Sequence, residues 1–159
     1  MGRVYSKREL LEARSSWRAE GRTVVFTNGC YDLLHPGHIR LLESAKSLGD
    51  VLILALNSDA SVARMKGPAR PIFPQAERAG LAAALEAVDA VVMFGEDTPR
   101  ELISEVLPDI LVKGADWSHF IAGREEVEAA GGRVLTLPLE SGYSSSHLIE
   151  DLLARARTR

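Results

Sequence analysis

The sequence contains a single cysteine, Cys30, among its 159 residues. One cysteine cannot form an internal disulfide, and a CxxC zinc or redox site needs at least two. No apolar run approaches the roughly 18 residues of a membrane-spanning helix, and no apolar signal core follows the N-terminus. These absences favour a reducing compartment, so we expect a cytoplasmic protein that does not bind membranes.

Neither sign of charge dominates the sequence. The 19 Lys and Arg residues against 22 Asp and Glu residues leave a formal net charge of −3. Nucleic-acid-binding domains usually carry a basic patch interleaved with aromatic residues, and this chain has no such stripe. We expect no nucleic-acid partner, and any anion that the protein binds must be held by a local site.

The length of the chain is that of about one domain. Hydrophobic residues make up 46% of it and charged residues 26%, which is enough apolar surface to fill one core. Ser6 and Glu9 have the spacing of a capping box, so an N-terminal helix is predicted within residues 1–21. An α/β core is predicted for residues 22–159, and the two parts together form a single domain over 1–159.

Short β-branched runs alternate with helical patterns along the core. Strands are predicted at 23–27, 51–56, 90–94, 110–113 and 133–137. Helices are predicted at 37–48, 75–85, 99–106, 124–130 and from 145 onward, with a Gly- and Pro-rich loop at 65–74. Because parallel crossovers are right-handed, this order predicts a three-layer, doubly wound α/β fold with a parallel five-stranded, Rossmann-like sheet. Its ligand crevice is expected at the carboxyl ends of the strands.

The segment with the most specific chemistry joins the first of these strands to the helix at 37–48. His35 and His38 stand three residues apart where this helix begins, so both imidazoles face the same side, next to free backbone N–H groups. Gly37 between them lets a phosphate approach the backbone closely. Two imidazoles at a helix N-terminus can stabilise charge on the oxygens of a phosphate under attack. Asp32 is expected to orient the loop or a histidine.

This His-x-Gly-His segment resembles the signature of the nucleotidyltransferase superfamily that includes the cytidylyltransferases and pantetheine-phosphate adenylyltransferase. Further matches in chain order resemble the heptose 1-phosphate adenylyltransferase family, the ADP-heptose synthase domain of lipopolysaccharide-precursor biosynthesis. They are Asn57-Ser58-Asp59, Lys66-Gly67 with Arg70-Pro71, residues 85–89, Glu96-Asp97-Thr98-Pro99 and residues 111–116. The resemblance covers about residues 23–153. In many members this domain follows a sugar kinase, for which 159 residues leave no room, so a stand-alone form is expected.

The resemblance implies a reaction and its participants. The phosphate oxygen of D-glycero-β-D-manno-heptose 1-phosphate attacks the α-phosphorus of ATP, which gives ADP-heptose and pyrophosphate. ATP and the sugar 1-phosphate are the implied partners, and Mg²⁺ is expected on the phosphates of the nucleotide, with no metal site formed by the protein. Relatives tend to form homodimers or larger homo-oligomers, and the same is expected here.

The resemblance also implies roles for individual residues. Those expected in catalysis are His35, His38 and Lys66. Those expected at the nucleotide are Asn28, Gly29, Cys30, Tyr31, His35, Gly37, His38, Lys113, Gly114, Ser144, Ser145 and Ser146. Those expected at the sugar phosphate are Asn57, Asp59, Arg70 and Asp116. The family usually has Ser-Thr-Thr where this chain has Ser144 to Ser146, and the hydroxyl groups that hold phosphates are kept.

Two alternatives remain. A glycerol-3-phosphate cytidylyltransferase shares the Asp-Leu-Leu-His-x-Gly-His run, but those enzymes usually have Arg-Tyr-Val-Asp at residues 86–89 and Arg-Thr-x-Gly at residues 139–142. This chain has Glu-Ala-Val-Asp and Leu-Glu-Ser-Gly at these positions. The second alternative is a nucleotide-binding module without turnover. His35, His38 and Lys66 argue against it, because such a module has no need of groups that act on the α-phosphate.

Overall fold

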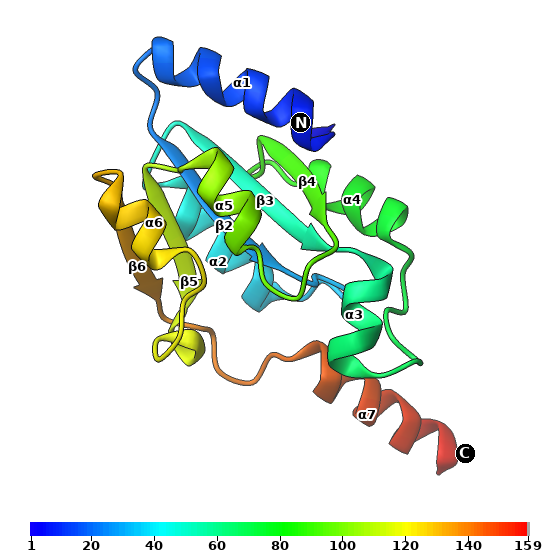
Figure 1. Ribbon diagram of the computed structural model, residues 1–159. Coiled ribbons are helices and arrows are strands. Elements are labelled where there is room, and N and C mark those ends of the chain that lie inside the picture. Colours follow the sequence, from blue (N-terminus) through cyan, green and yellow to red (C-terminus); the bar gives the residue numbers. More distant parts are fainter. Residues whose placement is uncertain (159) are drawn as a thin grey trace.

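The structure, a computed structural model, describes residues 1–158 apart from the side chain of Trp117. Six parallel strands form one sheet in the order β1-β4-β3-β2-β5-β6 (Figure 1). The strands are β1 (Arg3–Tyr5), β2 (Val24–Gly29), β3 (Val51–Asn57), β4 (Ala90–Phe94), β5 (Ile110–Gly114) and β6 (Arg133–Leu137). The chain moves outward from β2 in both directions, which is the doubly wound arrangement predicted from the sequence.

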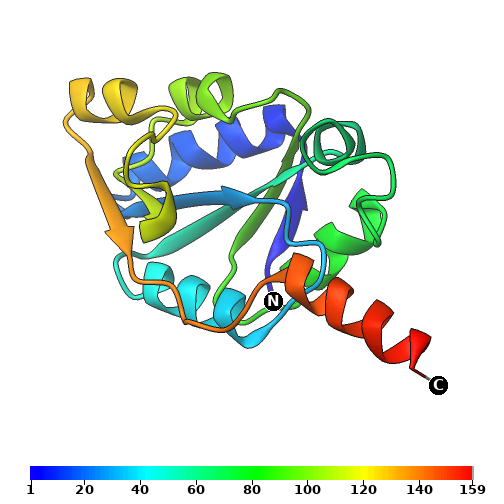
Figure 2. The ribbon, with the colours of Figure 1, turned by 90° about the horizontal axis from the view of Figure 1, so that it is seen from below.

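Helices cover both faces of this sheet (Figure 2). The helices α1 (Lys7–Ala19), α5 (Arg100–Val106) and α6 (Arg124–Ala129) lie on one face, and α2 (Pro36–Lys46) and α4 (Gln75–Ala83) lie on the other. The three-layer α/β fold is therefore confirmed.

Strand residues alternate between two cores. In β2, Val24 and Phe26 face the core beneath α1 and α5, whereas Val25 faces the core beneath α2 and α4. All seven residues of β3 are buried. Because both faces are covered, the central strands are apolar without interruption, and the loops at their carboxyl ends rest on a fixed base.

The prediction of five strands is wrong by one. The segment 1–21 contributes β1 as well as a helix, and β1 pairs with β4 at the edge of the sheet. Three residues are too few to give a periodic pattern, and Val4 is exposed. The sequence therefore carries almost no signal for this strand.

A helix after β3 was also missed. The helix α3 (Asp59–Lys66) begins after Ser58, whose hydroxyl accepts a hydrogen bond from the amide of Ser61 at 3.2 Å. The predicted loop at 65–74 therefore starts two residues later than expected. Lys66 is the last residue of a helix, so its backbone is fixed by the helical hydrogen bonds before it.

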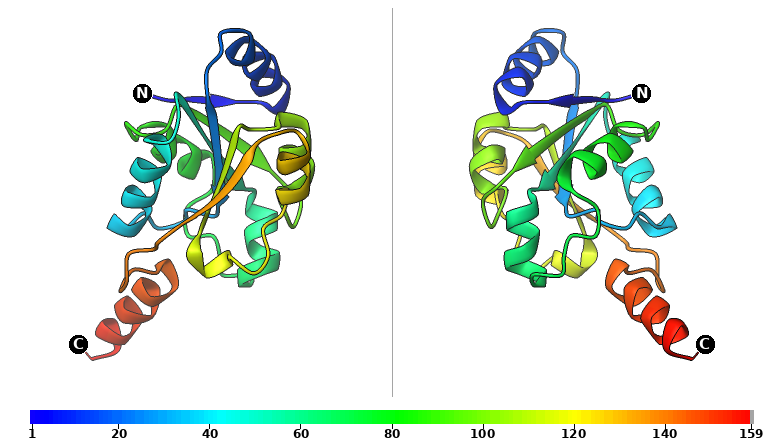
Figure 3. Two further views of the ribbon diagram at one scale, coloured as in Figure 1. Left: turned by 90° about the vertical axis from the view of Figure 1, so that its left-hand side faces the viewer. Right: turned by 90° about the vertical axis from the view of Figure 1, so that its right-hand side faces the viewer.

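The last helix, α7 (Ser145–Arg157), starts where it was predicted. None of its residues is buried, and it extends away from the sheet (Figure 3). Within residues 1–158, no helix combines the length and the apolar character needed to cross a membrane.

Candidate active site

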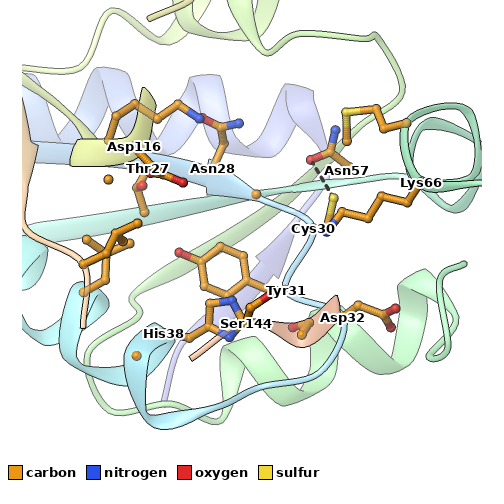
Figure 4. A pocket seen from close by; sticks show the side chains of 18 of the residues that line it. Thr27, Asn28, Cys30, Tyr31, Asp32, His38, Asn57, Lys66, Asp116 and Ser144 are labelled. Carbon is orange, nitrogen blue, oxygen red and sulfur yellow. Dashed lines mark hydrogen bonds between the residues drawn. The ribbon is translucent and has the colours of Figure 1, made fainter. Parts of the chain in front are cut away.

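A cavity of about 550 Å³ opens at the carboxyl ends of the strands. The ends of β2, β3 and β5 and the loops after β2, β4, β5 and β6 line it, together with the end of α3 and the starts of α2 and α7. Figure 4 shows Asn28 and Asp116 at one end, Asn57, Cys30 and Lys66 at the other, and His38 and Ser144 along one side. This is the edge at which open α/β sheets bind their ligands.

His35 and His38 form a stacked pair at the start of α2. Their ring centroids are 3.6 Å apart, and Pro36 occupies the first helical turn. The His35 Nδ1 accepts a hydrogen bond from the His38 amide, and the His38 Nδ1 accepts one from the His35 amide, both at 3.3 Å. Because each Nδ1 is an acceptor, a neutral ring carries its proton on Nε2. Each histidine therefore presents an N–H donor.

Burial keeps both imidazoles neutral. It lowers the pKa of His35, and burial, with smaller electrostatic contributions from the neighbouring His35 and Lys66, lowers the pKa of His38 to about 4. Tyr31 and Tyr143 pack beside the pair, with ring centroids 4.6 Å from His38 and 5.7 Å from His35. Two neutral donors at a helix N-terminus can bind a phosphate oxygen without any proton transfer.

Gly37 keeps this corner open. A Cβ on this residue would lie 3.1 Å from the imidazole of His35 and 3.2 Å from the Cβ of Tyr143. A side chain at this position would therefore require His35 or Tyr143 to move by a few tenths of an ångström.

Two lysines line the cavity from different elements. Lys66 is exposed at the end of α3, where a long side chain can follow a bound phosphate. Lys113 lies at the end of β5 and is half-buried. Burial lowers the pKa of Lys113 to about 8, while Asp116 and Cys30 act in the opposite direction. Lys113 therefore remains largely charged at neutral pH.

The amino end of α7 forms the side of the pocket next to the histidines. Ser144 caps the helix by accepting a hydrogen bond from the His147 amide at 3.4 Å, and the Ser145 hydroxyl donates to the Leu33 carbonyl at 2.8 Å. Both serines line the cavity, whereas Ser146 is exposed and does not. A helix N-terminus attracts anions through its unpaired N–H groups.

The remaining residues expected at the nucleotide also line the cavity, among them Asn28, Gly29 and Gly114. Among the side chains and main chain that the structure describes, the buried amide oxygen of Asn28 has no hydrogen-bond partner, so a donor on a ligand would satisfy it. Cys30 lies beside Asn57, with 3.8 Å between its Sγ and the amide oxygen. Burial raises the pKa of the Cys30 thiol, which does not favour a nucleophilic role.

The residues expected at the sugar phosphate divide into two groups. Asn57 and Asp116 line the cavity, whereas Asp59 and Arg70 do not. The Asp59 carboxylate accepts a hydrogen bond from the buried Arg78 at 2.9 Å, and Arg70 Nε donates to Asp32 at 2.8 Å. As placed, Asp59 and Arg70 are engaged in holding the fold.

Asp32 ties two loops together, as expected from the sequence. Its side chain is fully buried and accepts hydrogen bonds from the amides of Ile72 and Phe73 and from Arg70. Burial by itself would raise the pKa of Asp32, but these three donors outweigh it and the pKa is lowered. The carboxylate thereby fixes the loop that leads to the histidines against the loop after α3.

Arg78 is a structural residue of the site that sequence reasoning missed. Its guanidinium is fully buried and donates to the carbonyls of Cys30, Asn57 and Phe73. It thus joins the ends of β2 and β3 behind the pocket. In the sequence it looks like any arginine on a helix, and no signal distinguishes it.

Sequence reasoning also gave no role to several residues that line the cavity. They come from the loop after β4, the loop after β6 and the segment after β5, and include Asp97, Thr98, Phe120, Leu139, Glu140 and Tyr143. Of these, Asp97 and Thr98 lie in the Glu96-Asp97-Thr98-Pro99 match, which was the available signal.

The described residues do not form a metal site of their own. Between residues 1 and 158, no group of three or more His, Cys, Asp and Glu side chains lies close enough to hold an ion. This part of the chain therefore offers a divalent ion no set of side-chain ligands. Magnesium bound to the nucleotide stays a prediction.

Comparison with known proteins shows where this architecture recurs. The family described as cytidylyltransferase-like matches residues 26–151. The crystal structure of the lipopolysaccharide core biosynthesis protein from Thermoplasma volcanium GSS1 is 32% identical in sequence, with a TM-score of 0.62. The similarity covers 78% of this chain and 100% of that one.

Curated relatives are more similar in sequence. Bifunctional protein HldE of Syntrophotalea carbinolica is 52% identical over 151 residues, which cover 94% of this chain and 30% of the relative. Bifunctional protein HldE of Coxiella burnetii is 51% identical over 151 residues, with 94% and 32% covered. The chain thus spans about a third of the length of these relatives.

Proposed function

The chain belongs to the cytidylyltransferase-like family, and from this membership and its pocket we propose that it transfers AMP from ATP to a heptose 1-phosphate. An oxygen of the sugar phosphate attacks the α-phosphorus of ATP, and the bond from that phosphorus to the pyrophosphate oxygen breaks. The products are ADP-heptose and pyrophosphate. We further propose that the product supplies lipopolysaccharide or a related glycan, and that the reaction takes place in the cytoplasm.

The observation that carries this proposal is the histidine pair. His35 and His38 stack with both Nδ1 atoms occupied by main-chain N–H groups, so both Nε2–H groups are donors. They would bind the non-bridging oxygens of the α-phosphate as negative charge grows on them in the transition state. The protein contributes position and electrostatics, and no side chain has to form a covalent bond.

The cations and the serines complete this arrangement. Lys66 and Lys113 would neutralise phosphate charge from two sides of the cavity. Ser144 and Ser145, with the N-terminal amides of α7, would hold the departing pyrophosphate. Magnesium would enter with ATP as part of the substrate.

The family's description favours a rival, cytidylyl transfer from CTP, for which glycerol 3-phosphate is the acceptor that the sequence resemblance suggests. The two reactions are separated by measuring pyrophosphate release with Mg·ATP and D-glycero-β-D-manno-heptose 1-phosphate, with CTP, the α-anomer and glycerol 3-phosphate as parallel substitutions. We expect turnover with the first pair. Turnover confined to CTP and glycerol 3-phosphate would establish the rival, and nucleotide binding without any turnover would establish a non-catalytic module.

The His38→Asn variant tests the role of the pair. Loss of one preorganised donor should lower kcat about 100- to 1000-fold, with little change in the melting temperature. His119→Asn is the matched control, because His119 is exposed and does not line the cavity, and it should keep wild-type kcat. Wild-type turnover by a folded His38→Asn protein would overturn the proposed mechanism.

A further inference from the structure

The loop after β4, residues 95–99, forms a wall of the cavity that the proposed mechanism does not use. Asp97, Thr98 and Pro99 line the cavity from this loop. Asp97 and Thr98 are exposed, whereas Pro99 is buried. Because a carboxylate repels phosphate, Asp97 is suited to an uncharged part of a substrate rather than to the phosphates that the same cavity is proposed to bind.

The sheet topology separates this wall from the nucleotide. The strand order reverses between β2 and β5, and open α/β sheets bind the nucleotide in the crevice at such a point. Asn28 and Gly29 from β2 and Lys113 and Gly114 from β5 line that crevice. The end of α3 and the loop after β4 line the cavity on the other side of β2 and are left for the second substrate. Figure 4 agrees, with Asn28 at the end opposite Asn57 and Lys66.

The geometry of the displacement also places the sugar phosphate on the side of β2 that carries β3 and β4. The attacking oxygen and the leaving oxygen must lie roughly in line through the α-phosphorus. If pyrophosphate is held by Ser144 and Ser145, the attacking sugar phosphate approaches from another wall of the cavity. Lys66 at the end of α3 can take its phosphate, and the sugar ring then faces the loop after β4.

This loop is held in place by a set of hydrogen bonds. Arg64 Nε donates to the Asp97 Oδ1 at 2.9 Å, and Arg64 Nη2 donates to the Gly95 carbonyl at 2.6 Å. On the inner side, Asn57 Nδ2 donates to the Ser61 hydroxyl at 3.0 Å, and that hydroxyl donates to the Glu96 carbonyl at 3.1 Å. The helix that carries Lys66 therefore also positions Asp97.

Asp97 has capacity for a ligand beyond this contact. A carboxylate has about four lone-pair sites, and within the described residues 1–158 the Asp97 side chain accepts one hydrogen bond, from Arg64. Its side chain is 77% exposed, so a substrate can reach it. A carboxylate beside a hydroxyl matches the hydroxyl groups of a sugar, which donate hydrogen bonds and carry no charge.

We propose that Asp97 and Thr98 bind the hydroxyl groups of the sugar acceptor and set its specificity. The inference rests on the proposed function and adds a site for the sugar itself, apart from its phosphate. Asp97 accepts hydrogen bonds from sugar hydroxyls, and Thr98 supplies a further donor and acceptor.

The test compares Asp97→Asn and Thr98→Val with the wild type in steady-state kinetics. Asp97→Asn should raise the KM for heptose 1-phosphate about tenfold or more, because a hydrogen bond to a charged group is lost, with the KM for ATP within about twofold. Glu96→Gln is the matched control. It removes the neighbouring carboxylate, which accepts from the Gly95 amide and does not line the cavity, and the KM values should not change.

Binding of heptose 1-phosphate by calorimetry separates the possible failures. If Asp97→Asn turns over with an unchanged KM for heptose 1-phosphate, this inference is wrong and the proposed function stands. The same holds if the KM values for heptose 1-phosphate and ATP rise equally. If the wild type binds heptose 1-phosphate but shows no turnover, and Asp97→Asn weakens this binding, the sugar site is supported and the proposed function is wrong. Absence of sugar phosphate binding to the folded wild type overturns both.

Discussion

At the scale of single residues, the histidine pair is prepared before any substrate arrives. The main-chain amides of His35 and His38 fix which ring nitrogen accepts and which donates. A ring held in one tautomer needs no reorganisation when phosphate charge develops beside it. This preorganisation has a cost that depends on pH, because a buried neutral imidazole resists protonation.

We expect His38 to make the protein less stable at acidic pH. Burial, with smaller electrostatic contributions from His35 and Lys66, lowers the pKa of His38 to about 4, from an ordinary value of 6.5. Between these two values the unfolded chain binds more protons at this site than the folded one, so this contribution to stability falls as the pH falls. Urea unfolding at pH 7 and pH 5 should show a smaller loss in His38→Gln than in the wild type. Equal losses would contradict the neutral state of His38.

The Asp32–Arg70 pair gives a second prediction at this scale. Arg70 is 10% exposed and Asp32 is fully buried. Asp32→Ala leaves a nearly buried guanidinium without its partner, so the free energy of unfolding should fall by about 3–5 kcal/mol. Asp151→Ala on the exposed α7 should change it by less than about 0.5 kcal/mol. If Arg70 acts mainly on the substrate, Arg70→Lys will raise the KM for heptose 1-phosphate and leave the free energy of unfolding unchanged, which would contradict the structural role.

At the scale of elements, patterns within one segment predicted most of the fold. Five strands and the helices between them follow from apolar runs and turn residues. The strand β1 was missed because it is short and lies at an edge, where its stability depends on pairing with β4. The helix α3 was missed because Asp59 to Lys66 has a weak apolar pattern, with Ser61 and Val62 as its buried residues.

The parts of the site that belong to one segment of the chain were predictable, and the parts that depend on distant partners were not. His35, Gly37 and His38 belong to one contiguous segment, so their proximity follows from local geometry. Asp59 and Arg70 are placed by partners 19 and 38 residues away, Arg78 and Asp32, and no local pattern reveals such a pair. The loop after β4 joins the cavity only because β4 lies next to β3, which the sequence order alone does not fix.

The junction of β1 and α1 offers a prediction at this scale. Ser6 accepts a hydrogen bond from the Glu9 amide at 3.2 Å, and the Glu9 carboxylate accepts one from the Ser6 amide at 2.8 Å. Ser6→Ala should lower the free energy of unfolding by about 1 kcal/mol. Ser15→Ala, an exposed position inside α1, is the control and should not destabilise the protein. Equal effects in urea unfolding would show that this cap contributes nothing specific.

At the scale of the whole molecule, rigidity is distributed unevenly. The sheet is buried on both faces, and the loops of the cavity rest on it. The helix α7 differs, because it has 13 residues and none is buried. An isolated helix of this length is marginal in water. Its first turn nevertheless lines the proposed phosphate site through Ser144 and Ser145.

This arrangement makes α7 the element that a protease should attack first. Trypsin should cleave after Arg155 and Arg157, which are exposed, well before it reaches the buried Arg14 and Arg78. Mass spectrometry of a timed digest gives the order of cleavage, and early loss of a segment other than α7 would contradict this expectation.

ATP should slow the cleavage, because phosphate at a helix N-terminus stabilises the helix. The survival of one exposed helix under digestion would then report whether the phosphate end of the cavity is filled.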